Sequence, residues 1–257
     1  MSGRRDREAR REERQQEERQ AGASERRQRM IKLASAVAFL ALVVVAVLIV
    51  ISQSQNSGGD SGNIADAKLV NQELAGIPQD GMVLGDPAAK VTVLEFGDLQ
   101  CPVCKGYAEE VLPQVIENQV QSGRAKLDFR NFTIISEQST PAGAAAIAAG
   151  EQGRGWNFVE LFYRNQGEEA SGYADDEFLT AIARAAGVSD LAKWNRDRKS
   201  RRIVSEVEAT TAEAEQLGFT GTPSFALKGP ATSGTEPIGT PDSAEALESA
   251  IDDAGGR

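Results

Sequence analysis

The stretch VTVLEFGDLQCPVC, residues 91–104, holds the only two cysteines of this 257-residue chain. Its first part, Val91 to Phe96, is almost continuously apolar, which is typical of a parallel strand buried on both faces. Apolar residues then recur at spacings of three and four from Val103 to Val120, and Gly123 ends that pattern, so a helix is predicted there. The stretch therefore places Cys101 at or next to a helix N-terminus.

A thiol in that position loses its proton easily, because the free N–H groups and the dipole of a helix N-terminus stabilise an anion. In Cys-x-x-Cys motifs the thiol pKa falls from about 8.5 to roughly 3.5–7.5, and the thiolate is the nucleophile of disulfide exchange. Pro102 suits the first helical turn, whereas Pro113 predicts a kink further along. The spacing of Cys101 and Cys104 thus favours redox chemistry.

Three other roles for the cysteine pair stay open from the residues alone. Half of a zinc site is one, although the chain offers no second cysteine pair and no histidine. A purely structural disulfide is another, although so short a loop would restrict the unfolded chain little. Two inert buried thiols are the third.

The first 51 residues predict a membrane anchor. Residues 1–32 contain 11 Lys and Arg and 7 Asp and Glu but almost no large apolar side chains, which predicts a charged, solvated tail. Residues 33–51 are 19 consecutive uncharged, mostly apolar residues, a length that matches a hydrocarbon core of about 30 Å. They predict one transmembrane helix, with a cleaved signal peptide as the alternative.

The flanking charges predict the orientation of this helix. Basic residues crowd positions 26–32, whereas residues 52–59 carry no charge, so the positive-inside rule places the tail in the cytoplasm. Residues 52–66 are expected to form a flexible linker. The sequence thus predicts a single-pass protein of the cell membrane, with an extracytoplasmic domain at residues 67–257.

The charge and the predicted compartment restrict the function. Residues 33–257 carry 17 Lys and Arg against 31 Asp and Glu, a balance of −14, which argues against nucleic-acid binding. Disulfides form and persist outside the cytoplasm. Because this chain has one cysteine pair only, we expect it to act on the disulfides of other proteins.

The first half of the predicted domain contains a strand–helix–strand unit. Its second strand runs from Ala125 to Phe132, where alternating apolar residues indicate one buried face near the edge of a sheet. Helical signals and no convincing strand follow over residues 139–218. Asp175 is expected to cap one of these helices, and Gly218 ends another.

The second half returns to strands. One opens at residues 221–227, a second short strand is expected near residues 237–238, and Asp242 with Glu245 predicts a capping box for a final helix. The sum is one mixed α/β domain, βαβ plus ββα, with a helical insertion between the halves.

Three motifs in this order resemble a known family. Leu94-Glu95-Phe96, the CPVC of residues 101–104, and Gly221-Thr222-Pro223 after a helical stretch are similar to the DsbA-like thioredoxin-fold thiol:disulfide oxidoreductases, in particular the membrane-anchored bacterial kind. The resemblance covers about Leu84 to Asp253. It implies a thioredoxin fold and a protein-disulfide oxidoreductase that needs no metal or other cofactor.

The resemblance also implies roles for individual residues. Cys101 would be the exposed nucleophile, and Cys104 the buried resolving cysteine. Thr222 and Pro223 would hold a cis peptide bond beside the disulfide, where the backbone pairs with the substrate chain. The two residues between the cysteines would also contact substrate; they are Pro102 and Val103.

Glu95, six residues before Cys101, matches the buried acidic residue that assists proton transfer at the resolving cysteine; a surface carboxylate is the alternative. A buried carboxylate has a raised pKa and can act near neutral pH. Val103 departs from the family pattern, because the best-known strongly oxidising members have a histidine at this position. The helix terminus remains, so a lowered thiol pKa is still expected.

The leading hypothesis is a membrane-tethered oxidase that introduces disulfides into exported proteins. Its partners would be exported clients with thiols and a membrane reoxidase, similar to DsbB or to vitamin K epoxide reductase. A reductase or isomerase on the same fold is one alternative. A non-catalytic binding module that works as a chaperone is another.

Overall fold

A computed structural model describes residues 64–256 of the chain. The predicted tail and transmembrane helix, residues 1–51, and most of the predicted linker lie outside this range. No helix between residues 64 and 256 is both long and apolar enough to cross a membrane. Of the linker, Ala65 is described, and its N–H and C=O are both bonded to the Asn165 side chain, at 2.8 and 3.1 Å.

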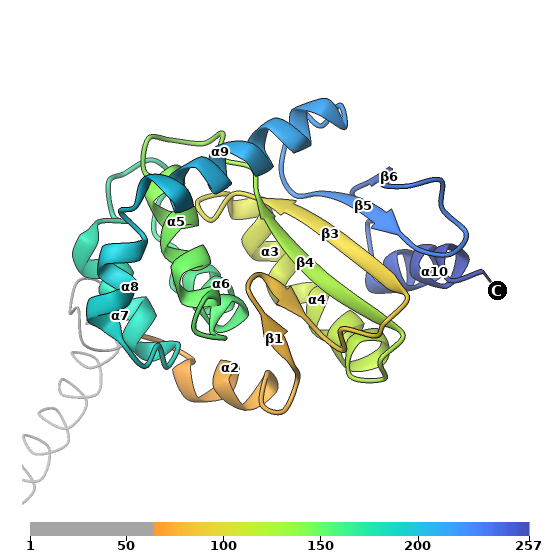
Figure 1. The fold of residues 1–257 in the computed structure, drawn as a ribbon, viewed down its shortest axis with the longest axis horizontal. Coiled ribbons are helices and arrows are strands. Elements are labelled where there is room, and N and C mark those ends of the chain that lie inside the picture. The colour runs from red at the N-terminus through yellow and green to blue at the C-terminus, as the bar shows by residue number, and fades with distance from the viewer. Residues whose placement is uncertain (1–63, 257) are drawn as a thin grey trace, which may run out of the picture. The chain divides into compact units, whose positions relative to one another are not determined.

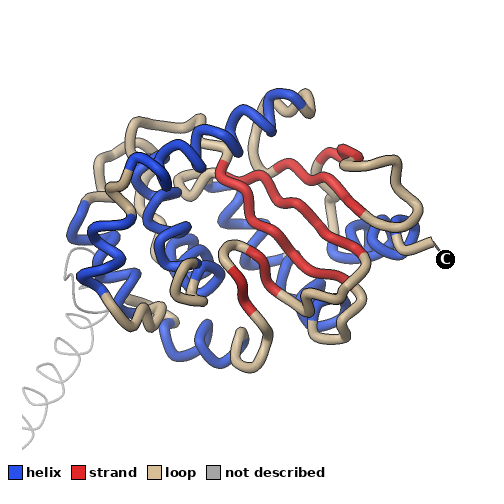
Figure 2. Tube along the Cα trace, viewed as in Figure 1, coloured by secondary structure: helices blue, strands red, loops and turns tan. Residues whose placement is uncertain are grey.

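A six-stranded sheet in the order β1-β2-β4-β3-β5-β6 organises the fold (Figures 1 and 2). At its centre, β3 runs parallel to β4 and antiparallel to β5. The strands are β1 (Gln79–Asp80), β2 (Val83–Leu84), β3 (Val91–Gly97), β4 (Ala125–Asn131), β5 (Ser224–Lys228) and β6 (Glu236–Gly239). The predicted βαβ and ββα halves of a thioredoxin fold are both present.

The helices surround this sheet, and those between β4 and β5 form the predicted insertion (Figure 1). They are α2 (Ala67–Glu73), α3 (Pro102–Glu110), α4 (Leu112–Val115), the π-helix η1 (Ile116–Val120), α5 (Ser139–Gly150), α6 (Gly155–Arg164), α7 (Asp176–Ala185), α8 (Leu191–Asp197), α9 (Arg201–Gln216) and α10 (Ala244–Ala254). The short helices α2 and α8 were not predicted.

Strand β3 is buried on both faces, as its apolar run predicts. Val91 and Val93 join the larger core cluster, together with residues of α3, α4 and α10. Leu94 and Phe96 point to the opposite face, where they pack against Ala214 of α9. Residue 95 shares the face of Val91 and Val93, so Glu95 lies on the side of the sheet that α3 covers.

The predicted helix over residues 103–120 is broken at the predicted kink. Helix α3 ends at Glu110, and Val111 (φ −109°, ψ −51°) separates it from α4, where Pro113 stands in the first turn. Proline lacks the N–H that would continue the helical ladder. The helical segment continues as the π-helix η1. The turn after it contains Gly123, whose φ of 72° suits glycine.

Strand β4 does not lie near the edge of the sheet, so that prediction is wrong. A hairpin of β1 and β2 adds on its outer side, with Val83 opposite Asp128 and Leu84 opposite Leu127. Each of these added strands has two residues, which is too short for an alternating pattern to be visible in the sequence.

The insertion is built around α5, which is buried over nearly its whole circumference. Its alanines allow neighbouring helices to approach closely, and the Trp194 indole of α8 donates to the Ala145 carbonyl at 2.9 Å. Asp175 caps α7 as predicted, since its side chain accepts from the N–H groups of Glu177 and Phe178.

The capping box predicted at Asp242 is wrong by one residue. Ser243 is the N-cap of α10, and its hydroxyl accepts from the Ala246 N–H at 3.2 Å.

Replacing Ser243 with alanine should therefore lower the free energy of unfolding by about 1 kcal/mol. The control Asp242→Ala should change it by less than about 0.5 kcal/mol. Urea unfolding followed by circular dichroism measures both, and an equal loss in the two variants would contradict this assignment.

Candidate active site

Cys101 is the N-cap residue of α3, as the sequence predicts. Its backbone is extended (φ −76°, ψ 119°), and Pro102 occupies the first turn of the helix. The Cys104 N–H points back and donates to the Cys101 Sγ atom at 3.3 Å. Both cysteines are free thiols in this structure. One orphan N–H of the helix terminus is thus already directed at Cys101 Sγ.

Neither cysteine is exposed, which corrects the expectation for Cys101. Its side chain and backbone are 4% exposed, and Cys104 is fully buried. The Cys101 Sγ atom lies 3.4 Å from the Thr222 carbonyl, so the loop before β5 covers it. Val103 takes the surface position instead and is 63% exposed.

The two thiols differ strongly in acidity. A hydrogen bond from the Cys104 side chain is the main cause that lowers the pKa of Cys101 to about 6; Thr222 and the N–H groups of Cys104 and Val103 add to it, against the effect of burial. Burial, followed by the interaction with Cys101, raises the pKa of Cys104 well above the usual thiol value. Only Cys101 is therefore a thiolate near neutral pH.

This difference predicts a pH-dependent and selective alkylation. In the reduced protein, modification of Cys101 by iodoacetamide should rise with a midpoint near pH 6, because the thiolate is the reacting species. Cys104 should stay unmodified through this range. Mass spectrometry of quenched samples distinguishes the two sites. A midpoint near 9, the ordinary value for a thiol, would contradict the geometry described here.

The Thr222–Pro223 peptide bond is cis, as the resemblance implies. It directly precedes β5, whose Ser224 is in register with Phe96 of β3. The strand pairing thus brings residues more than a hundred positions apart to the N-terminus of α3. The Thr222 hydroxyl is buried and is one of the groups that lower the pKa of Cys101.

Glu95 is buried, so the surface alternative is wrong. It is 1% exposed, and it lies between Phe129 of β4 and Phe225 of β5 in the register of the sheet. Neither carboxylate oxygen has a hydrogen-bond partner. Burial, and secondly the charge of Glu160, raises the pKa of Glu95 to about 8. The carboxyl group is therefore protonated at neutral pH.

Sequence reasoning missed Asp98, which is fully buried three residues before Cys101. One carboxylate oxygen accepts from the Gln100 N–H at 2.9 Å, and the other accepts from the N–H groups of Ile134 and Ile135 at 2.9 and 3.0 Å. The Asp98 carbonyl accepts from the Cys101 N–H at 2.9 Å. An acidic residue next to the motif was the available signal.

Gln166, which follows α6, was missed as well. Its side-chain amide donates to the Leu99 carbonyl at 2.7 Å and to the Cys101 carbonyl at 3.1 Å. It stands 65 residues from Cys101 in the sequence. No local pattern marks such a contact.

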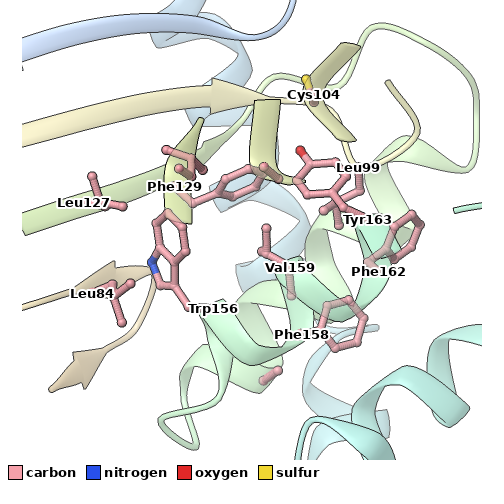
Figure 3. Close-up of a cluster of buried hydrophobic side chains, with 14 of the residues drawn as sticks. Leu84, Leu99, Cys104, Leu127, Phe129, Trp156, Phe158, Val159, Phe162 and Tyr163 are labelled. Atoms are coloured by element: carbon pink, nitrogen blue, oxygen red, sulfur yellow. The ribbon is translucent and has the colours of Figure 1, made fainter. Parts of the chain in front are cut away.

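Apolar and aromatic side chains enclose the buried side of the motif (Figure 3). Leu99 and Tyr163 lie near Cys104, and Phe129 extends the same cluster toward Trp156. Gly97 is required here, because a Cβ atom would come within 2.9 Å of Phe129 and of the Tyr163 hydroxyl. The packing keeps the surroundings of Cys104 dry, which fits its raised pKa.

No group of three or more potential ligand residues that could hold a metal ion occurs in residues 64–256.

The sequence matches the family model described as thioredoxin over residues 78–253, from β1 into α10. This chain belongs to the thioredoxin family. The thioredoxin-family match spans both halves of the sheet and the helical insertion between them. It therefore covers the cysteine pair and the cis-proline loop together.

Among curated relatives, this thioredoxin-family chain is 30% identical over 149 residues to the probable disulfide bond formation protein D of Bacillus cereus, covering 57% of this chain and 69% of that protein. A putative protein-disulfide oxidoreductase of Rickettsia prowazekii is 26% identical over 178 residues, which cover 69% of this chain and 64% of that protein. The chain is thus a DsbA-like thiol:disulfide oxidoreductase.

Solved structures share the fold of this chain. BdbD from Bacillus subtilis, in its oxidised form, superposes with a TM-score of 0.60 at 19% identity, over 69% of this chain and 97% of BdbD. A thioredoxin-like oxidoreductase from Silicibacter pomeroyi has a TM-score of 0.53 at 29% identity, over 74% and 96% of the two chains. The former shows the fold alone, because its identity is low.

Proposed function

We propose that this chain is a membrane-tethered, extracytoplasmic oxidase that introduces disulfides into exported proteins through Cys101 and Cys104. The observation that carries the proposal is the acidity difference between the two thiols: the pKa of Cys101 is lowered to about 6, and that of Cys104 is raised. A thiolate that is stable in the reduced protein favours the reduced form. A protein whose reduced form is stabilised donates its disulfide.

The reaction starts from the oxidised protein. A client thiolate attacks the Cys101 sulfur, a client–Cys101 bond forms, the Cys101–Cys104 bond breaks, and Cys104 leaves with the electron pair. A second client thiolate then attacks the client sulfur of this mixed disulfide and releases Cys101 as a thiolate. The client ends with a disulfide and the protein with two reduced cysteines, so two electrons have moved to the protein.

Glu95 acts in the first of these steps. Cys104 is a poor leaving group as an anion, because burial raises its pKa. Glu95 is protonated at neutral pH and can supply the proton that Cys104 takes up. When the protein is oxidised again, the same carboxylate accepts that proton.

Pro102, Val103, Thr222 and Pro223 form the client contact in this proposal. Val103 is the most exposed of the large apolar residues in the described chain. The loop of Thr222 and Pro223 presents its backbone next to Cys101. An extended client could pair with that backbone and pack against Val103.

The tether and the partners rest on the sequence. Residues 33–51 are the proposed transmembrane helix, residues 1–32 its cytoplasmic tail, and residues 52–66 a linker to the catalytic domain. The clients are exported proteins with thiols. A membrane reoxidase, similar to DsbB or to vitamin K epoxide reductase, restores the disulfide.

The reduction potential of the full-length protein in detergent tests the direction of electron flow. The protein is equilibrated in glutathione buffers, and its free thiols are trapped and counted by gel shift. A value near about −120 mV is expected for an oxidase. A value near about −270 mV would overturn the oxidase and indicate a reductase.

A further inference from the structure

The segment that precedes α3 is held by the helical insertion. Gln166 donates from one amide nitrogen to the Leu99 and Cys101 carbonyls, at 2.7 and 3.1 Å. Tyr163 lies three residues earlier, one helical turn away, and its hydroxyl is 3.3 Å from the Asp98 carbonyl, to which it donates. The last turn of α6 and the residues that follow it therefore bind three carbonyls of four consecutive residues.

These contacts fix the residue whose sulfur reacts. The Cys101 carbonyl also accepts from the Lys105 N–H at 3.1 Å, the first helical bond of α3. With Gln166 as a second donor, both lone pairs of that carbonyl are used. The backbone of Cys101 is thereby held in the orientation in which the Cys104 N–H meets its Sγ atom.

The contacts also change the electrostatics around Cys101. Carbonyl oxygens carry partial negative charge, and two of them, at residues 99 and 101, lie in the segment that bears the thiol. The amide of Gln166 offsets that charge with its N–H donors. Without it, the thiolate would lie near two less compensated dipoles in a buried site, where such interactions are strong.

We propose that Gln166 is a positioning residue that stabilises the Cys101 thiolate and thereby couples the helical insertion to the redox equilibrium. The inference deepens the proposed function, because it takes Cys101 as the reacting thiol. It assigns to the insertion a part in setting how strongly the protein oxidises.

Three substitutions of Gln166 in the full-length protein separate donation from simple packing. Alanine removes the donor, glutamate replaces it with an acceptor, and lysine keeps a donor and adds positive charge. Gln152→Ala is the matched control, because Gln152 also holds loop backbone in the insertion, through Asp190, and has no contact with the cysteine segment. The pKa of Cys101 is measured from thiolate absorbance, and the redox equilibrium is measured against glutathione.

We expect Gln166→Ala to reduce the thiolate fraction at pH 6 by about two- to fivefold and Gln166→Glu to reduce it further. The equilibrium should shift toward the oxidised protein by up to about tenfold, which corresponds to about 30 mV. Gln166→Lys should lower the pKa of Cys101 below that of the wild type. The control should leave the pKa unchanged.

A different order of the variants would overturn the inference. If alanine, glutamate and lysine all shift the pKa equally, or no more than Gln152→Ala does, Gln166 serves packing only. Because the sign of the lysine effect is opposite to the others, a shared loss of stability cannot imitate the expected result. A wild type that is a poor oxidant would refute the proposed function, yet the differences among variants would still decide the role of Gln166.

Discussion

Replacing Cys101 with serine is expected to abolish thiol–disulfide exchange completely. Without Cys101, the Cys101–Cys104 disulfide that a client attacks can no longer form. The Cys101 thiol has a pKa of about 6 and is a thiolate at pH 7, whereas a serine hydroxyl stays protonated there and is a poor nucleophile. The measurement is the loss of free thiols from a reduced client protein mixed with stoichiometric, pre-oxidised enzyme. One wild-type molecule should consume two client thiols, and the variant none.

The matched variant Cys104→Ser separates catalysis from client binding. It keeps the reactive thiolate and lacks the buried partner that would release a client, so covalent complexes with disulfide-bearing clients should accumulate at Cys101. These complexes should disappear on treatment with a reductant. A Cys101→Ser variant that still promotes client folding at the wild-type rate would instead establish the non-catalytic binding module.

Replacing Glu95 with glutamine is expected to stabilise the fold and slow the chemistry at once. Burial raises the pKa of Glu95 from 4.5 to about 8. The unfolded chain therefore releases this proton at lower pH than the folded chain, and wild-type stability falls as pH rises from about 4.5 until it levels off above about 8. Removing the group should add about 3 kcal/mol at pH 7 and less than about 1 kcal/mol at pH 5. Urea unfolding at the two pH values gives the difference.

The kinetic part of this prediction has its own control. Glu160 of α6 is also buried, with a pKa raised to about 8 by burial. It donates no proton in the proposed chemistry, although its charge is the second cause of the raised pKa of Glu95. Glu160→Gln should gain stability in the same pH window and stay within about twofold of the wild-type rate, because burial, the larger cause of the raised pKa of Glu95, is unchanged. Glu95→Gln should exchange disulfides at least about tenfold more slowly. Stopped-flow reaction with a small dithiol measures the rate. Equal rates in both variants would remove Glu95 from the proton transfer.

Local patterns predicted most of the fold that carries the site. The apolar run of β3, the helical periodicity after it and Pro113 located the cysteine pair and the break in its helix, because each signal lies within a few residues of the structure that it causes. The β1–β2 hairpin could not be found in this way. Its two-residue strands form because the backbone of β4 is free to pair on the side away from β3, and this cause is tertiary.

The candidate site also has some features with local causes and others with tertiary causes. Cys101, Cys104 and Glu95 belong to one continuous stretch. Motif spacing identified the two cysteines, and the family resemblance identified Glu95. The burial of Cys101 depends on the Thr222 loop, and the hold on its carbonyl depends on Gln166; both contacts join segments far apart in sequence. Pairing of β5 with β3 and docking of α6 decide them, so only the folded chain reveals them.

The edges of the sheet affect how readily this protein pairs and aggregates with unfolded chains. Both edge strands in the described chain are short: β1 has two residues, and β6 has four, including Pro237, which has no N–H to offer. Long free edges recruit other strands and seed aggregation. In the proposed function, extended clients pair with the loop at Thr222. The short edge strands offer such clients no second place for strand pairing, so their complexes with this protein can stay transient.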